Sequence, residues 1–186
     1  PSELIRRVAA RYAAYYGDDI FIAPLVNTIL FSNESQRVQY TAQSSLPMFD
    51  AAKVIKEIEI QANASNMSDK EGAIKSISQY FIRQEASQDK ALKSIQDKQE
   101  KFDTRMSAVR GLRNYNNHKQ VSSLLEVLKD NSDDDKIRVA LAEALGWFNL
   151  SIHKDVIYKA LETVNRDESS SEQLKSETLQ SLKRLK

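Results

Sequence analysis

Few side chains in this 186-residue chain have types and spacings suited to catalysis or metal binding. It contains no cysteine, which excludes disulfides, thiolate metal sites and cysteine nucleophiles. Its two histidines, His118 and His153, lie in expected connectors, and a metal site would need further ligands such as Asp134 and Asp155. Because the His-x-x-x-His spacing of zinc sites is absent, we expect solvated loop histidines. Neither a metal nor a cofactor is predicted.

An acidic run at positions 133–135 invites interpretation as a calcium site. The alternating oxygens, central glycine and closing glutamate of an EF-hand are absent, however. Acidic groups favour the positive end of a helix, so we expect the run to cap a helix over 136–148. Glycine occurs only at positions 17, 72, 111 and 146, which excludes the glycine-rich nucleotide-binding and hydrolase motifs. No nucleophile has a candidate base beside it, and we do not expect an enzyme.

The composition is that of an ordinary globular protein built from helices. Hydrophobic residues make up 41% of the chain, enough for a core, whereas 4 glycines and 3 prolines are too few for a turn-rich β-fold. The formal net charge is +1, so any binding to nucleic acid or anionic lipid must be local. The most apolar stretch, 20–31, is shorter than the roughly 20 residues that span a bilayer. We expect a buried helix there and no membrane insertion.

The ends of the chain carry no recognisable targeting segment. No basic start precedes an apolar run, so no signal peptide is expected. The chain opens at Pro1 without a methionine and stops inside an amphipathic pattern, which suggests a fragment of a longer protein or a processed one. A chain without cysteine suits the cytoplasm or the periplasm equally, so the compartment is not predicted.

An internal repeat organises the whole sequence. Aromatic or aliphatic residues that close an amphipathic segment recur every 32 to 34 residues, at Tyr16, Phe49, Phe81, Tyr115, Phe148 and Leu182. A second apolar segment lies between successive anchors, at 22–31, 51–60, 89–97, 121–128 and 156–164. Each repeat is therefore predicted to be two helices, joined by polar connectors that supply helix caps. Because one pair cannot bury its apolar faces alone, neighbouring pairs must stack.

The predicted fold is all-α: a single array over 1–186, forming a right-handed α-solenoid of five to six two-helix repeats. First helices should line one face of the array and second helices the other. Over 62–101 the pattern is weakest, so we expect the least regular repeat there, with a longer loop near 63–68.

The segment KIRVALAEALGWF (136–148) resembles the short bacterial HEAT-like repeat of the phycobilisome-lyase type, whose consensus contains an arginine followed by Ala-Leu-Gly. The segment TRMSAVRGLRNY (104–115) is similar but matches less fully. The resemblance is good over 102–165, fair over 2–49 and weak over 50–101. It implies that Arg105 and Arg138 form structural ion pairs with acidic residues of the preceding turn.

The remaining signals concern the surface. Tyr15, Tyr80 and Trp147 each precede an anchor by one residue, one helical step from the core face. They would form a partner-binding strip if half exposed, but packing between successive repeats is the favoured interpretation. Phe148 should be buried and Trp147 partly exposed. The candidate partner-binding residues are Tyr15, Tyr80, Arg110, Arg113, Glu143 and Trp147.

These features predict a non-enzymatic interaction or scaffolding module, whose partner is another protein or the rest of its own chain. The alternative is nucleic-acid binding through local basic patches at Arg6, Arg7, Arg11, Arg110 and Arg113. Some HEAT-like proteins, the alkylpurine DNA glycosylases among them, use a basic groove in this way. Here Glu143, Glu172 and Glu177 interrupt the basic helices, which favours a protein partner. A lyase or glycosylase activity rests on family analogy alone.

Overall fold

The structure is a computed structural model that describes residues 1–31, 33–65, 68–112 and 118–186. Every regular element in these ranges is helical, which confirms the predicted all-α class. The chain divides into two compact units, Pro1–Ser87 (unit 1) and Gln88–Lys186 (unit 2). In the same ranges, no helix has both the length and the apolar character needed to cross a bilayer.

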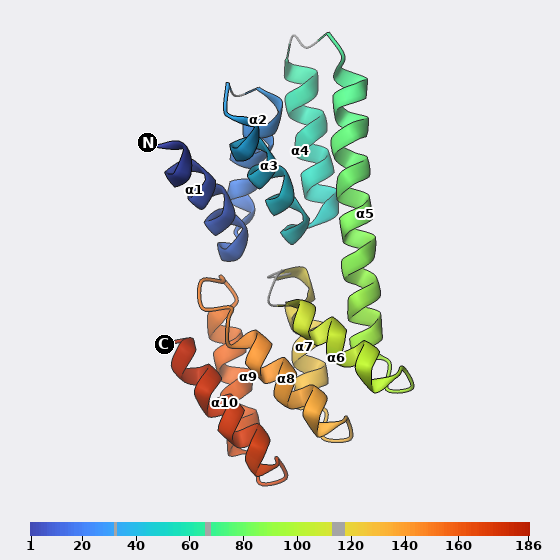
Figure 1. The fold of residues 1–186 in the computed structure, drawn as a ribbon, viewed down its shortest axis with the longest axis vertical. Helices are drawn as coiled ribbons and strands as arrows, with labels where there is room; N and C mark the ends of the chain where they lie inside the picture. Colours follow the sequence, from blue (N-terminus) through green and yellow to red (C-terminus); the bar gives the residue numbers. More distant parts are fainter. Residues whose placement is uncertain (32, 66–67, 113–117) are drawn as a thin grey trace. The chain divides into compact units, whose positions relative to one another are not determined.

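Unit 1 begins with two stacked helix pairs (Figure 1). Its helices are α1 (Glu3–Tyr16), α2 (Ile22–Leu30), α3 (Gln36–Ser45), α4 (Ala51–Ala64) and the first part of α5 (Lys70–Gln96). Helix α1 packs on α3, and α2 packs on both α3 and α4. Alternate helices therefore form separate layers, as predicted, with the core between them.

Side-chain caps set where these helices begin. Ser2, Ser35 and Asp50 each accept a hydrogen bond from a backbone N–H three residues later, at the starts of α1, α3 and α4. Helix α1 ends at Gly17, whose φ of 79° is the left-handed conformation that glycine adopts without strain. The predicted capping role of the polar connectors is confirmed at Ser35.

Unit 2 repeats the two-layer arrangement more regularly (Figure 1). It contains α6 (Phe102–Gly111), α7 (Val121–Lys129), α8 (Asp135–Leu145), α9 (Lys154–Arg166) and α10 (Glu172–Arg184). Helix α8 packs against both α6 and α10 in one layer, and α7 packs against α9 in the other. Fully buried leucines at 124, 128, 141, 145 and 161 fill the space between the layers. Each unit is thus a stack of helix pairs, as in an α-solenoid.

The third repeat is not the predicted helix pair. A single helix of 27 residues, α5, replaces the two segments expected around Phe81 and over 89–97. No glycine or proline occurs from position 73 to position 96, so nothing in this stretch stops a helix once it has started. The predicted irregularity over 62–101 is confirmed. The loop expected near 63–68 falls between the end of α4 and the start of α5, and its residues 66–67 lie outside the described part of the chain.

Most of the described anchors occupy the core. Phe49, Phe81, Phe148 and Leu182 are buried, as the 32 to 34-residue period predicted. Tyr16 is an exception, because it is 47% exposed and packs edge-to-face on Phe21 at the end of α1. Tyr115 lies outside the residues that the structure describes.

Arg6, Arg105 and Arg138 each lie ten residues before an anchor, and the ion pairs of Arg6 and Arg105 run in the opposite direction from the one that the resemblance implied for this position. Arg6 Nε lies 2.6 Å from Glu34 Oε1, and Arg105 Nη1 lies 2.8 Å from Asp133 Oδ1. Both acidic partners come 28 residues later, in the connector of the following repeat. In these two repeats, the acidic residue therefore ties the repeat to the next one.

Arg138 contacts the turn before its own helix. Its Nε donates to the carbonyl oxygen of Leu128 at 3.0 Å, and its Nη2 donates to Asn131 Oδ1 at 2.7 Å. Asn131 in turn donates to Asp167 Oδ2 at 3.1 Å. Hydrogen bonds from Ser169 and Asn131 lower the pKa of Asp167 to about 2. Arg138 is thus linked to Asp167, in the connector of the following repeat, through the side-chain amide of Asn131.

The acidic run serves two structural purposes. Asp134 caps α8 as predicted, with its carboxylate accepting hydrogen bonds from the backbone N–H groups of Lys136 and Ile137. Asp133 is buried against Arg105, a partner that the sequence analysis did not assign to it. The run is therefore part of the framework of unit 2.

Candidate functional site

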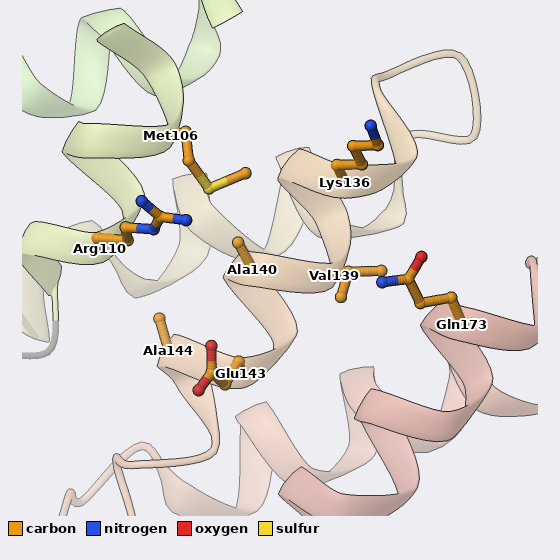
Figure 2. A pocket seen from close by; sticks show the side chains of 8 residues that line it. All are labelled: Met106, Arg110, Lys136, Val139, Ala140, Glu143, Ala144 and Gln173. Carbon is orange, nitrogen blue, oxygen red and sulfur yellow. The ribbon is translucent and has the colours of Figure 1, made fainter. Parts of the chain in front are cut away.

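A groove in unit 2 runs along α8 between α6 and α10 (Figure 2). It encloses about 420 Å³. Its lining combines residues of three helices: Met106, Arg110, Lys136, Val139, Ala140, Glu143, Ala144 and Gln173. It contains Arg110 and Glu143, two of the six residues predicted from the sequence.

The floor of the groove is one stripe of α8. Lys136, Val139, Ala140, Glu143 and Ala144 follow the three-and-four spacing that places residues on one face of a helix. The opposite face of α8 carries buried Ile137, Leu141 and Leu145, which hold the helix on the core. The same spacing brings Trp147 to the end of the stripe, just beyond the last turn of α8.

The neighbouring helices form the walls. Met106 and Arg110 point from α6 toward α8, and Gln173 points from α10 toward Val139 (Figure 2). The apolar groups of Met106, Val139 and the two alanines lie among charged and amide side chains. Within the described part of the chain, Arg110 and Lys136 form no ion pair or hydrogen bond through their side chains. The groove therefore combines apolar side chains with available cationic groups.

Trp147 is held in place by α10. It is 50% exposed, which confirms the predicted partial exposure, and the guanidinium carbon of Arg184 lies 5.2 Å from its ring centroid. Arg184 Nη1 also donates to Glu177 Oε1 at 3.1 Å and to Ser181 Oγ at 3.2 Å. The indole is therefore oriented by a side chain that is itself fixed, while half of its surface stays open to a partner.

A close approach of α8 and α10 produces this arrangement. Ser181 Oγ donates to the carbonyl oxygen of Ala142 at 2.9 Å, and Gly146 lies against Ser181. A Cβ atom at Gly146 would lie 2.5 Å from Ser181 Oγ and 3.0 Å from Ser181 Cα. The second contact involves the backbone of α10, so the helix itself would have to move.

Gly146→Ala is expected to lower the free energy of unfolding by about 1–3 kcal/mol, the usual cost of overpacking. Alanine favours a helix over glycine by only about 1 kcal/mol, so the clash with α10 decides the sign. Gly111→Ala is the matched control, because no described atom lies within 4 Å of a Cβ built there. Urea unfolding should show Gly111→Ala unchanged or stabilised. Equal effects of the two substitutions would contradict the close-approach explanation.

The described members of the six predicted residues are divided between the two units. Trp147 lies at the end of the groove stripe that includes Glu143, whereas Tyr15 and Tyr80 belong to unit 1. Tyr15 packs against the core of unit 1 and edge-to-face on Tyr12, in keeping with the favoured packing interpretation. Tyr80 is half-buried on α5. Arg113 lies outside the described residues.

The predicted solvated state of the histidines is wrong for His118. It is buried, its Nδ1 lies 2.9 Å from Ser151 Oγ, and its ring packs edge-to-face on Phe148. His153 is half-buried, with its ring centroid 5.9 Å from that of His118. Across the residues described, no three histidine, aspartate or glutamate side chains are grouped so that they could hold a metal ion. The two histidine rings therefore lie next to each other in unit 2, close to Phe148 at the end of α8.

Most of the groove lining was not predicted from the sequence, namely Met106, Lys136, Val139, Ala140, Ala144 and Gln173. The α8 members share a signal that was available, because they follow helical spacing back from Trp147. The contributions of α6 and α10 depend on how the helices stack, which the spacing of one helix does not reveal.

Comparisons with known proteins give little guidance. No protein-family model matches the chain, and no curated protein matches it. One solved structure is similar to it, that of human deoxyhypusine hydroxylase in complex with glycerol. The likeness covers 99% of this chain and 80% of that one, with 14% sequence identity and a TM-score of 0.38. At these values it indicates no function for this chain.

Proposed function

We propose that this chain is a non-enzymatic protein-interaction module built of short bacterial HEAT-like repeats, which scaffolds another protein or the rest of its own chain. The observation that carries the proposal is the groove of unit 2, together with the half-exposed Trp147, which helical spacing places just beyond the α8 stripe that lines the groove. Tryptophan and arginine are the residues most enriched among interface hot spots.

The composition of the groove supports a protein partner. Protein interfaces combine an apolar centre with a polar rim, and the groove has Met106, Val139 and alanines bordered by Arg110, Lys136 and Gln173. An α-solenoid presents a large ordered surface on rigid helices, which suits the binding of another chain. The groove presents charges of both signs, which gives orientation to a bound partner.

The basic patches give less support to nucleic-acid binding. Arg6, one cation of these patches, is paired with Glu34 and is therefore partly neutralised. Glu143 adds a carboxylate to the groove that contains Arg110. Binding to phosphates would also weaken steeply with salt, so nucleic-acid capture at two salt concentrations distinguishes that alternative.

Trp147→Ala should weaken partner capture while costing less than about 1 kcal/mol in stability, the value of an exposed cation–π contact. Trp147 is the only tryptophan, so its fluorescence reports this site alone. We expect iodide to quench it in the free chain and a bound partner to protect it. Affinity capture with the wild-type chain and the variant then measures the loss of binding.

Tyr40→Ala is the matched control for this substitution. Tyr40 is an aromatic residue of α3 that is 67% exposed and belongs to unit 1, outside the groove. Its removal should leave capture unchanged. If both variants capture partners as well as the wild type does, the groove does not carry the interaction.

A further inference from the structure

Helix α1 carries an apolar face that nothing in unit 1 buries. Leu4, Ile5, Val8, Tyr12 and Tyr16 are each between 45% and 65% exposed. Their spacing places them on one stripe of the helix, which is about 21 Å long at 1.5 Å per residue. Contiguous apolar surface of this kind marks an interaction site more often than scattered single residues do.

This stripe lies opposite the face that packs on α3. Ala13 and Ala14 are the buried residues of α1, and at 100° per residue their direction is roughly opposite to that of the stripe. Helix α8 also has two packing faces, because α6 lies on one side of it and α10 on the other. Helix α1 therefore has the surface pattern of a helix within a layer, with one of its two neighbours in place.

Helix α10 has a different outer face. Its outward residues are Glu172, Ser176, Gln180 and Lys183, with Leu179 as the large apolar side chain among them. That face is mostly polar, as expected of a helix surface in contact with water. Helix α1 lacks such a polar face, so its outer face is suited to being covered by a helix.

The charges beside the stripe select the partner. Arg7 and Arg11 lie one turn apart along one flank, and within the described residues neither forms an ion pair or hydrogen bond through its side chain. Glu3 is the single acidic residue of α1, and it lies one turn before Arg7 on the same row of the helix, so this flank keeps a net positive charge. A second copy of α1 would bring two flanks of net positive charge together, so self-pairing is disfavoured.

We propose that the outer face of α1 binds an amphipathic helix of a partner protein. Apolar residues of that helix contact Leu4, Val8 and Tyr12, and its flanking carboxylates pair with Arg7 and Arg11. This is the helix-in-groove mode of recognition, with anchors at three-and-four spacing. The surface belongs to unit 1, so it is separate from the groove of unit 2, and the failure of either proposal leaves the other standing.

The test uses the full chain and three labelled peptides of about 20 residues, long enough to form helices. One has leucines at three-and-four spacing flanked by glutamates, the second has lysines in place of the glutamates, and the third is a scrambled version of the first. Fluorescence anisotropy should show that the glutamate peptide binds and the other two do not. Val8→Glu should weaken its binding by roughly tenfold or more.

Charge reversal keeps the test decisive if Val8→Glu fails to fold. Replacing both Arg7 and Arg11 with glutamate should abolish binding of the glutamate peptide and allow the lysine peptide to bind. Absence of binding by the glutamate peptide, or equal binding by the scrambled one, would overturn the proposal.

A dimer in analytical ultracentrifugation that Val8→Glu dissociates would show instead that a second copy covers the face. Binding to phosphatidylcholine–phosphatidylserine vesicles that Val8→Glu abolishes would show that a membrane does.

Discussion

Replacing Arg105 with methionine is expected to lower the free energy of unfolding of unit 2 by about 3–5 kcal/mol, because it leaves a buried carboxylate without its partner. The side chains of Arg105 and Asp133 are 4% and 2% exposed. Two parallel hydrogen bonds of 2.8 Å join the guanidinium to the carboxylate. Arg105 also donates to the carbonyl oxygen of Ile95 at 3.1 and 2.6 Å. Its removal therefore breaks contacts to two other segments at once.

Urea unfolding followed by Trp147 fluorescence measures this loss in unit 2. Replacing Arg105 with methionine and Asp133 with leucine together should recover much of the stability, because no buried charge then remains. Arg166→Met is the control, since Arg166 pairs with Glu162 on the surface at 2.7 Å and should cost less than about 1 kcal/mol. If Arg105→Met costs no more than Arg166→Met, the buried pair is not a structural tie between repeats.

The period of the repeat was visible in the sequence because each turn of the array buries the same positions. Phe49, Phe81, Phe148 and Leu182 are buried where the 32 to 34-residue spacing placed them. The break expected within the third repeat was wrong, since it relied on periodicity alone. Helix termination needs a local signal such as glycine, proline or a capping residue, and the stretch 73–96 has neither glycine nor proline.

The pairing of charged residues could not be predicted in the same way. The direction of the Arg105 pair depends on which connector lies beside α6 after the helices stack, which is a property of the tertiary structure. His118 illustrates the same limit, because its burial results from the contact with Phe148 and Ser151 of the next repeat. Composition predicts a solvated histidine in a polar connector, whereas inter-repeat packing decides its surroundings.

The candidate site was predicted in part. Trp147 was found because it precedes the anchor Phe148 by one residue. Arg110 was found because it belongs to a basic cluster, and Glu143 because it interrupts the basic helices. The small residues of α8 that form the groove floor carry no chemical signal of their own. They become a site when α6 and α10 leave that stripe uncovered, so the groove emerges from the stacking of three helices.

Phe148→Ala is expected to lower the free energy of unfolding of unit 2 by about 3–5 kcal/mol, the range for truncating a buried phenylalanine. The side chain is fully buried in the core of unit 2 and packs edge-to-face on His118, with ring centroids 6.3 Å apart. Its removal leaves a cavity where the end of α8 meets the next helix pair, and close packing on both sides limits how far that cavity can collapse.

Phe102→Ala is the matched control, because Phe102 belongs to the same unit and is 41% exposed. It should cost much less, and Phe148→Leu should fall between the two because it preserves part of the buried volume. Urea unfolding of the three variants, followed by Trp147 fluorescence, gives the order. Comparable losses for Phe102→Ala and Phe148→Ala would mean that the anchor position contributes no more than a surface aromatic. The repeat would then owe its period to the helix caps and connectors, and the buried anchors would be dispensable to the stacking of the helix pairs.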